Sequence, residues 1–207
     1  RDVRAYDVYD IVVRAYLDLG RGLLAEMWAR RALDAAVPSE GARVRPPEAL
    51  LIRSFRGQGK KREARKRAWA GIRDRPDNLR MARHVVDLRT PQPSEGSAKE
   101  FEHLQSAVRI LCKHSDEKDW IRRRCWLGRA WLDERREEFE SAEYTYHHLA
   151  ADLDRPLPLA EFLVRRGRCA DLEDFIVERM ESGNGLSNLE RRQLEGLREG
   201  CTTVGGE

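Results

Sequence analysis

Arginine is the residue type of this chain whose abundance points most directly to chemistry. The 207 residues include 33 arginines but only 6 lysines, and 36% of all residues are charged. A guanidinium can donate two parallel hydrogen bonds to a carboxylate or a phosphate, whereas a lysine ammonium acts as a point charge. The composition therefore favours recognition of an acidic group. An arginine-rich genome would produce the same bias, and composition alone does not separate the two explanations.

The positive charge is concentrated in the first part of the chain. Residues 1–89 contain 21 basic and 12 acidic residues, a net charge of +9, whereas the remaining residues contain 18 basic and 24 acidic residues, a net charge of −6. The whole chain carries only +3. A positive N-terminal part would attract an acidic protein segment or a nucleic acid.

The cysteines and histidines do not form a metal or redox motif. Cys112, His114 and Cys125 could approach one zinc ion, but a tetrahedral site needs a fourth ligand that the spacing does not offer. With Cys169 and Cys201 added, the sequence still contains no C-x-x-C pair. We therefore predict no metal and no cofactor, and we expect the cysteines to be free thiols of a cytoplasmic protein.

Motifs for catalysis are also missing from the sequence. It has no glycine-rich phosphate loop, no H-E-x-x-H and no G-x-S-x-G. Glu143 and His147 are four residues apart, so they could meet on one face of a helix, but such pairs are usually surface contacts. Cys125 as a nucleophile would need an orienting base, which the sequence does not identify. We therefore do not expect an enzyme.

Two stretches of the chain repeat one another at the spacing of helical hairpins. In each an aromatic residue lies four residues before a glycine, as Tyr16 and Gly20 and again as Phe55 and Gly59. Small residues follow the glycine after five, nine and twelve positions, as Ala25, Ala29 and Ala32 and as Ala64, Ala68 and Gly71. A glycine at the turn can adopt the left-handed conformation that ends a helix, and small residues let the next helix approach closely.

This pattern resembles the tetratricopeptide repeat family, whose first helix reads W-x2-L-G-x2-Y and is followed by A-x3-F, a further Ala and a Pro. A later stretch, L-G-R-A-W at residues 127–131, matches L-G-x2-Y, and its second helix would follow after about two extra residues in the turn. The resemblance implies an all-α, right-handed solenoid of about five hairpins. The hairpins are expected at about residues 6–39, 45–78, 79–116, 121–154 and 157–180.

The third and fifth repeats are weaker, and a further helix follows them. A proline-containing insertion at residues 90–97 interrupts the third repeat, and Pro156 and Pro158 shorten the first helix of the fifth. Ser187 and Glu190 predict a capping box that opens a capping helix over residues 187–199. We expect a single domain over residues 1–200 and a flexible tail at 201–207.

No stretch approaches the roughly 20 apolar residues of a membrane span, and no signal peptide is evident. We therefore expect no membrane partner. Because the chain begins with Arg1 and not with Met, we expect it to be a piece of a longer protein. The sequence does not indicate an oligomeric state.

The resemblance also suggests where a partner would bind, because the first helices of tetratricopeptide stacks line a concave groove. Some family members clamp the terminal carboxylate of a peptide there with Lys, Asn and Arg. This chain has Asp10 and Arg14 where the first clamp Lys and the Asn would fall, so it departs from the clamp. The registration nevertheless places seven arginines in the groove: Arg14, Arg53, Arg56, Arg80, Arg83, Arg122 and Arg129.

A second basic region is predicted on the outer side of the stack. Residues 60–67 include six cations and could touch nucleic acid or an acidic protein, although a solvated helix face is the more common role of such a run. Nucleic-acid binding would also need exposed aromatic residues beside the basic ones. The candidate aromatics are expected in the core instead: Trp69, Trp120, Trp126 and Trp131.

The function expected from the sequence is a protein-interaction scaffold that binds an acidic peptide or protein segment in the arginine-lined groove. Nucleic-acid binding through the basic N-terminal half is the alternative of a different class. A third hypothesis is that the chain is the sensor or regulatory arm of a larger signalling protein.

Overall fold

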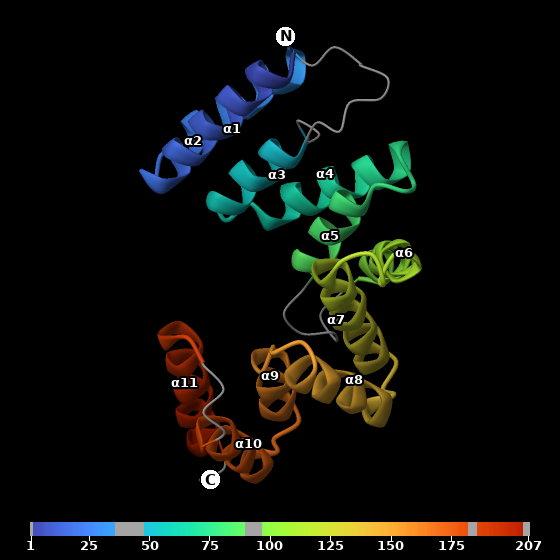
Figure 1. Cartoon of the computed structure of the whole chain (residues 1–207), viewed down its shortest axis with the longest axis vertical. Helices are drawn as coiled ribbons and strands as arrows, with labels where there is room; N and C mark the ends of the chain where they lie inside the picture. Colours follow the sequence, from blue (N-terminus) through green and yellow to red (C-terminus); the bar gives the residue numbers. More distant parts are fainter. Residues whose placement is uncertain (1, 36–47, 90–96, 182–185, 205–207) are drawn as a thin grey trace. The chain divides into compact units, whose positions relative to one another are not determined.

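The structure, a computed structural model, is entirely helical in the part of the chain that it describes. There the chain forms eleven α-helices and no strand, and consecutive helices pack against each other (Figure 1). This confirms the all-α prediction and agrees with a helical repeat, whereas the handedness and the number of repeats stay predictions. The described residues are 2–35, 48–89, 97–181 and 186–204.

The helices belong to two compact units, Arg1–Arg124 and Cys125–Glu207. Whether both form the single predicted domain stays a prediction. In the first unit, α1 packs on α2, α3 on α4 and α5 on α6. The first helices of these hairpins also contact one another, α1 with α3 and α3 with α5. The bounds are α1 Asp2–Asp18, α2 Gly22–Asp34, α3 Glu48–Gly57, α4 Lys61–Asp74, α5 Leu79–Asp87 and α6 Ala98–Lys113, followed by the start of α7, Asp119–Arg135.

Small residues lie at the helix crossings, as their spacing predicted. Ala25, Ala29, Ala64 and Ala68 have no exposed surface. At Gly71 an added Cβ would come within 2.6 Å of Met81 Cγ, so a larger residue would force α4 away from α5. The close approach of consecutive helices therefore depends on these positions.

The same type of turn joins the two helices of four hairpins. Gly20, Gly59 and Gly167 have φ angles of 69°, 72° and 67°, and Glu137 has the same left-handed conformation at 65°. The peptide N–H after each of them donates to the carbonyl five residues earlier, which is the hydrogen bond of a Schellman motif. The N···O distances are 2.7–3.0 Å in the pairs Arg21–Tyr16, Lys60–Phe55, Glu138–Asp133 and Arg168–Leu163.

The turn at Glu137 corrects the sequence prediction for the fourth hairpin. The predicted two extra residues are wrong, because this turn has the same three residues between its helices as the turns at Gly20 and Gly59. Gly128, which the prediction matched to the glycine inside the first helix of the family pattern, does lie within α7. At the turn itself the chain places an exposed glutamate, Glu137, in the conformation that glycine adopts most easily.

The second unit contains the end of α7 and four further helices. Its core includes Tyr146, Phe162, Ile176 and Leu194, none more than 2% exposed. Helix α9 packs on α8, α10 and α11, and it begins directly after Pro156, so the predicted shortening at this proline is confirmed. The bounds are α8 Phe139–Ala151, α9 Leu157–Arg165, α10 Cys169–Glu181 and α11 Asn188–Val204.

Helix α11 begins as predicted but continues further. Glu190 N donates to Ser187 Oγ at 3.2 Å and Ser187 N donates to Glu190 Oε2 at 3.1 Å, so the capping box is confirmed. The helix extends to Val204 instead of ending near Glu199, and Cys201 is 4% exposed. A flexible tail from residue 201 is therefore wrong for its first residues. Residues 205–207, like 90–96 of the predicted insertion, lie outside the described residues.

The prediction of free thiols is wrong. Cys169 and Cys201 are joined by a disulfide, and Cys112 and Cys125 are also disulfide-bonded, so no cysteine is free. Sequence spacing could not show the Cys169–Cys201 bond, because its partners are 32 residues apart and meet only through the packing of α10 and α11. No described helix has the length and apolar character that crossing a bilayer requires.

Candidate functional site

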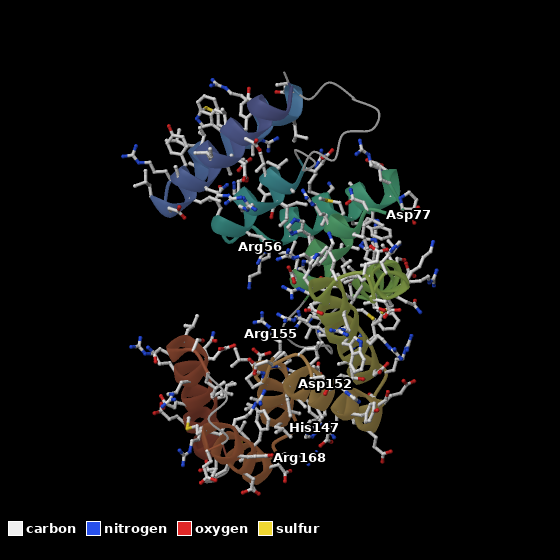
Figure 2. The ribbon with its side chains drawn as sticks, in the orientation of Figure 1. Arg56, Asp77, His147, Asp152, Arg155 and Arg168 are labelled. Atoms are coloured by element: carbon white, nitrogen blue, oxygen red, sulfur yellow. A yellow bond between two sulfur atoms is a disulfide. The ribbon has the colours of Figure 1, made fainter. Side chains whose placement is uncertain are left out.

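The candidate site lies on neighbouring faces of α3 and α5. On α3, the buried residues Ile52, Ser54 and Phe55 alternate with Arg53 and Arg56, which are one helical turn apart. Helix α3 packs on α5, so the arginines of α3 face solvent beside those of α5. The amphipathic pattern of each helix is what leaves its arginines at the surface. Figure 2 labels Arg56.

Helix α5 contributes the other half of the site, and its amphipathic pattern again leaves charged residues at the surface. Its buried stripe is formed by Met81, Ala82, Val85 and Val86. The residues opposite that stripe are Arg80, Arg83 and Asp87, which follow one another at helical spacing.

The charges of arginines on both helices affect the pKa of His84. Its burial lowers its pKa most strongly, the charges of Arg56, Arg83 and Arg53 lower it further, and Asp87 opposes the change. The resulting pKa is about 4, so His84 is uncharged at neutral pH. Three of the seven predicted groove arginines, from two helices, therefore lie near one imidazole.

Asp10 on α1 holds two of the predicted arginines. It accepts a hydrogen bond from Arg53 Nη1 at 2.7 Å and another from Arg14 on its own helix. Asp10 is only 7% exposed, whereas the side chains of Arg14 and Arg53 are 50% and 41% exposed. The carboxylate therefore orients these arginines and leaves part of each guanidinium in water.

Asp87 has the same role on α5. Its carboxylate accepts from Arg83 Nε at 3.3 Å and from Arg124 Nε at 2.6 Å, and the Arg83 guanidinium lies 5.6 Å from the centre of the Trp120 ring. Arg124 was not among the predicted site residues. The four-residue spacing of Arg83 and Asp87 was visible in the sequence, but the pairing with Arg124, 37 residues away, was not.

Of the remaining predicted arginines, one lies on α5 and two lie on α7. Arg80 is exposed on α5. Arg122 donates to Asp119 Oδ1 at 2.6 Å within the first turn of α7. Arg129 is exposed on α7 but belongs to the second unit. Membership of all seven arginines in one groove stays a prediction.

The second unit contains a charged group of its own. Glu134, which is 8% exposed, accepts two hydrogen bonds of 2.8 Å from Arg165 and one of 3.0 Å from the Tyr146 hydroxyl. Burial would lower the pKa of Arg165, but the hydrogen bond and charge of Glu134 raise it above the usual value. Sequence reasoning missed this network, because Glu134 and Arg165 are 31 residues apart.

The residues considered for catalysis and metal binding have other partners. His147 Nε2 lies 3.7 Å from Glu143 Oε1, the expected surface contact, and Glu143 also accepts from Arg168 Nη1 at 2.6 Å. Cys112 and Cys125 are disulfide-bonded, so they do not offer zinc a thiolate. Within the described ranges no three or more His, Cys, Asp and Glu residues are grouped as metal ligands.

Comparison of the chain with protein-family models, with curated proteins and with solved structures found no match. The likeness to tetratricopeptide repeats therefore rests on the residue pattern and on the packing of consecutive helices.

Proposed function

We propose that the chain is a protein-interaction scaffold that binds an acidic peptide or protein segment over α3 and α5. The supporting observation is that Arg53, Arg56 and Arg83 lie on the solvent sides of two helices that pack on each other, where their charges together lower the pKa of His84. Since His84 is neutral at pH 7, the positive charge of the group comes from arginines, which bind carboxylates in a bidentate manner.

The arrangement suits binding because two of these arginines are already oriented. Asp10 holds Arg53 and Asp87 holds Arg83, so these side chains lose less conformational entropy when a ligand arrives. Arg56 is exposed and has no ion-pair partner within the described residues, so its donors are available to a carboxylate. The proposal includes no catalytic step and needs no cofactor.

The disulfide bonds bear on the cellular compartment in which the scaffold works. A cytoplasmic location was predicted from free thiols, but all four cysteines are disulfide-bonded, and such bonds persist mainly in oxidising compartments. We propose that the scaffold works where these bonds stay oxidised. Alkylation of protein from its native cells, read by mass spectrometry, would show unmodified cysteines; four alkylated cysteines would restore the cytoplasmic prediction.

The binding proposal is tested with a labelled peptide rich in Asp and Glu. We expect Arg56→Glu combined with Arg83→Glu to weaken binding at low salt by about tenfold or more, because like charges then face the ligand. The matched control is Lys61→Glu with Arg75→Glu, which makes the same change of charge at exposed positions of the same unit. Fluorescence anisotropy measures both affinities.

A titration of His84 followed by NMR locates the ligand independently. An acidic peptide bound beside the three arginines would offset their charge, so the pKa of His84 should rise when the peptide is present. Equal weakening by both double variants, together with an unchanged pKa of His84, would contradict the proposed site.

A further inference from the structure

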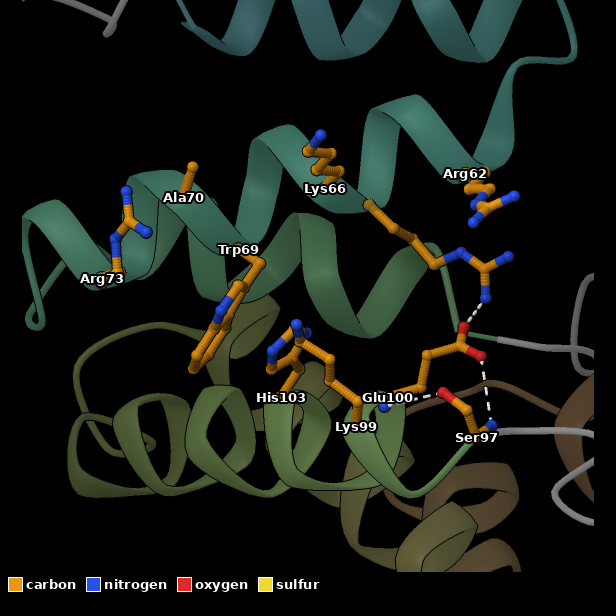
Figure 3. A pocket seen from close by; sticks show the side chains of 10 residues that line it. Arg62, Lys66, Trp69, Ala70, Arg73, Ser97, Lys99, Glu100 and His103 are labelled. Atoms are coloured by element: carbon orange, nitrogen blue, oxygen red, sulfur yellow. Dashed lines mark hydrogen bonds and ion pairs between the residues drawn. The ribbon is translucent and has the colours of Figure 1, made fainter.

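A hollow between α4 and α6 combines basic side chains with an aromatic stack. Its volume is about 650 Å³, within the range of small-molecule sites. Figure 3 shows Trp69 of α4 and His103 of α6 projecting into the space between the two helices. The residues that matter to the argument are Arg62, Lys66, Trp69 and Arg73 on α4, and Lys99 and His103 on α6.

The stack is formed by Trp69 and His103. Their ring centres are 3.7 Å apart and their planes differ by 15°. Trp69 follows the buried Ala68, but it is half-buried and lines the hollow, so its predicted place in the core is only partly right. Burial and the charge of Lys99 lower the pKa of His103, with Glu102 acting in the opposite direction, which favours the uncharged imidazole.

The cations of the hollow outnumber its acids. Of the described residues that line it, Glu100 is the one acid, and Arg65 lies in contact with it. Burial lowers the pKa of Arg65, and repulsion from Arg62 lowers it further. Lys66 and Lys99 form no ion pair with any described residue. The hollow therefore has a positive charge that the described residues do not balance.

The geometry points to a phosphorylated nucleoside as the ligand: we propose that a base stacks on the Trp69–His103 pair while phosphates contact Arg62, Lys66 and Lys99. Every base offers a π face to an aromatic side chain, and cations beside such a platform follow the phosphate backbone. The ligand is either a single-stranded nucleic acid or a free nucleotide, which share this chemistry. An acidic peptide would use the cations but would leave the aromatic pair unused.

The test compares two labelled probes, a short oligothymidylate and the same sugar-phosphate chain without bases. Trp69→Ala should weaken binding of the oligothymidylate by about tenfold or more and leave the abasic chain unaffected, because only the base uses the stack. Trp69→Phe keeps a π face and should retain most of the affinity. Circular dichroism shows whether each variant keeps its helices.

The contribution of charge is measured on the same probes. Lys66→Gln should reduce the dependence of log K on log salt by about 0.7 for the lost phosphate contact. The matched control is Lys61→Gln, an exposed cation of the same helix that does not line the hollow. It should change neither the affinity nor the salt dependence.

Two further arms identify the source of the ligand. Affinity that rises with oligonucleotide length indicates a nucleic acid, whereas full displacement by a mononucleotide of the same base, without gain from length, indicates a free nucleotide. The proposal is overturned if the abasic chain binds as tightly as the oligothymidylate, if an acidic peptide occupies the hollow in preference to both, or if no probe binds at low salt.

Discussion

The two units use the same ion-pair arrangement but differ in how much water reaches it. In the first unit, Asp10 on α1 accepts from Arg53 on α3, and the arginine side chain is 41% exposed. In the second, Glu134 on α7 accepts from Arg165 on α9, and the arginine side chain is only 20% exposed. A half-exposed arginine can share its donors with a guest, whereas an enclosed one cannot. The Asp10–Arg53 pair therefore suits binding and the Glu134–Arg165 pair suits stability.

The largest effect we predict is the loss of the enclosed pair. Glu134→Ala would leave the Arg165 side chain, which is 20% exposed, without its carboxylate, and we expect the free energy of unfolding to fall by about 3 kcal/mol, the lower end of the range for a buried pair. Asp10→Ala should cost only about 1 kcal/mol, because water can hydrate the half-exposed Arg14 and Arg53. Urea denaturation followed by circular dichroism measures both values.

Tyr146→Phe provides the control for this comparison. It removes one hydrogen bond to Glu134 and keeps the ring in the core, so it should cost about 1 kcal/mol. Equal costs for Glu134→Ala and Asp10→Ala would show that exposure does not distinguish the two pairs.

The disulfide of α10 and α11 should have the second largest effect, also in the second unit. Replacing Cys169 and Cys201 together by Ser should lower stability by about 2–4 kcal/mol, since the bond closes a loop between residues 32 positions apart. We expect α11 to lose protection first, which hydrogen exchange would show. Unchanged exchange in residues 188–204 would mean that packing alone holds the helix.

The difference between the units also explains what the sequence could predict about the fold. Small residues after Gly20 and Gly59 mark helix crossings directly, so the first two hairpins were predictable from spacing. In the second unit the same turn has Glu137, which gives no local signal for a left-handed conformation. The extension of α11 depends on Cys201, whose bonding partner is distant in sequence.

The candidate site was predictable to a similar degree. Helical periodicity places Arg53, Arg56 and Arg83 on solvent-facing sides, and the structure confirms that they are not buried. The pairing of Arg83 with Asp87 was visible as a four-residue spacing, whereas the pairing of Arg53 with Asp10 was not predictable, since it joins two hairpins. Trp69 was misjudged for a related reason: its spacing fits the core, but its ring stacks on His103 of another helix at the edge of a hollow.

The third prediction concerns pH and belongs to the first unit. The pKa of His84 is about 4 in the folded chain against about 6.5 unfolded, so the unfolded chain binds the extra proton first. Stability should be complete above pH 6.5 and should decline as pH falls from 6.5 to 4. His84→Gln should remove most of this slope, measured as urea midpoints over that range, and His103, whose pKa is also lowered, should contribute the rest.

Glu26 affects stability at lower pH than His84 does, so the two contributions can be told apart. Burial of Glu26 would raise its pKa, but hydrogen bonds from Arg30, Gln58 and Lys60 outweigh it and lower the pKa to about 2. Its contribution is complete above pH 4.5 and declines as pH falls from 4.5 to 2. Glu26→Gln should therefore change the slope only below pH 4.5. A slope between pH 6.5 and 4 that keeps its full size in His84→Gln would contradict the assignment to His84.

The smallest predicted effect concerns the type of turn that occurs in both units. Glu137→Gly should raise the free energy of unfolding by about 0.5–1 kcal/mol, because glycine adopts φ near 65° without the strain that a Cβ causes, while its greater freedom in the unfolded chain offsets part of the gain. Gly59→Ala is the reverse experiment. A Cβ at Gly59 would meet nothing within 4 Å, so the expected loss of about 1 kcal/mol comes from the backbone alone. Urea denaturation measures the change in the free energy of unfolding of both variants. A gain for Glu137→Gly with a loss for Gly59→Ala would establish that the two turns are equivalent. A loss for both variants would mean that the Glu137 side chain stabilises its turn in a way that glycine cannot replace.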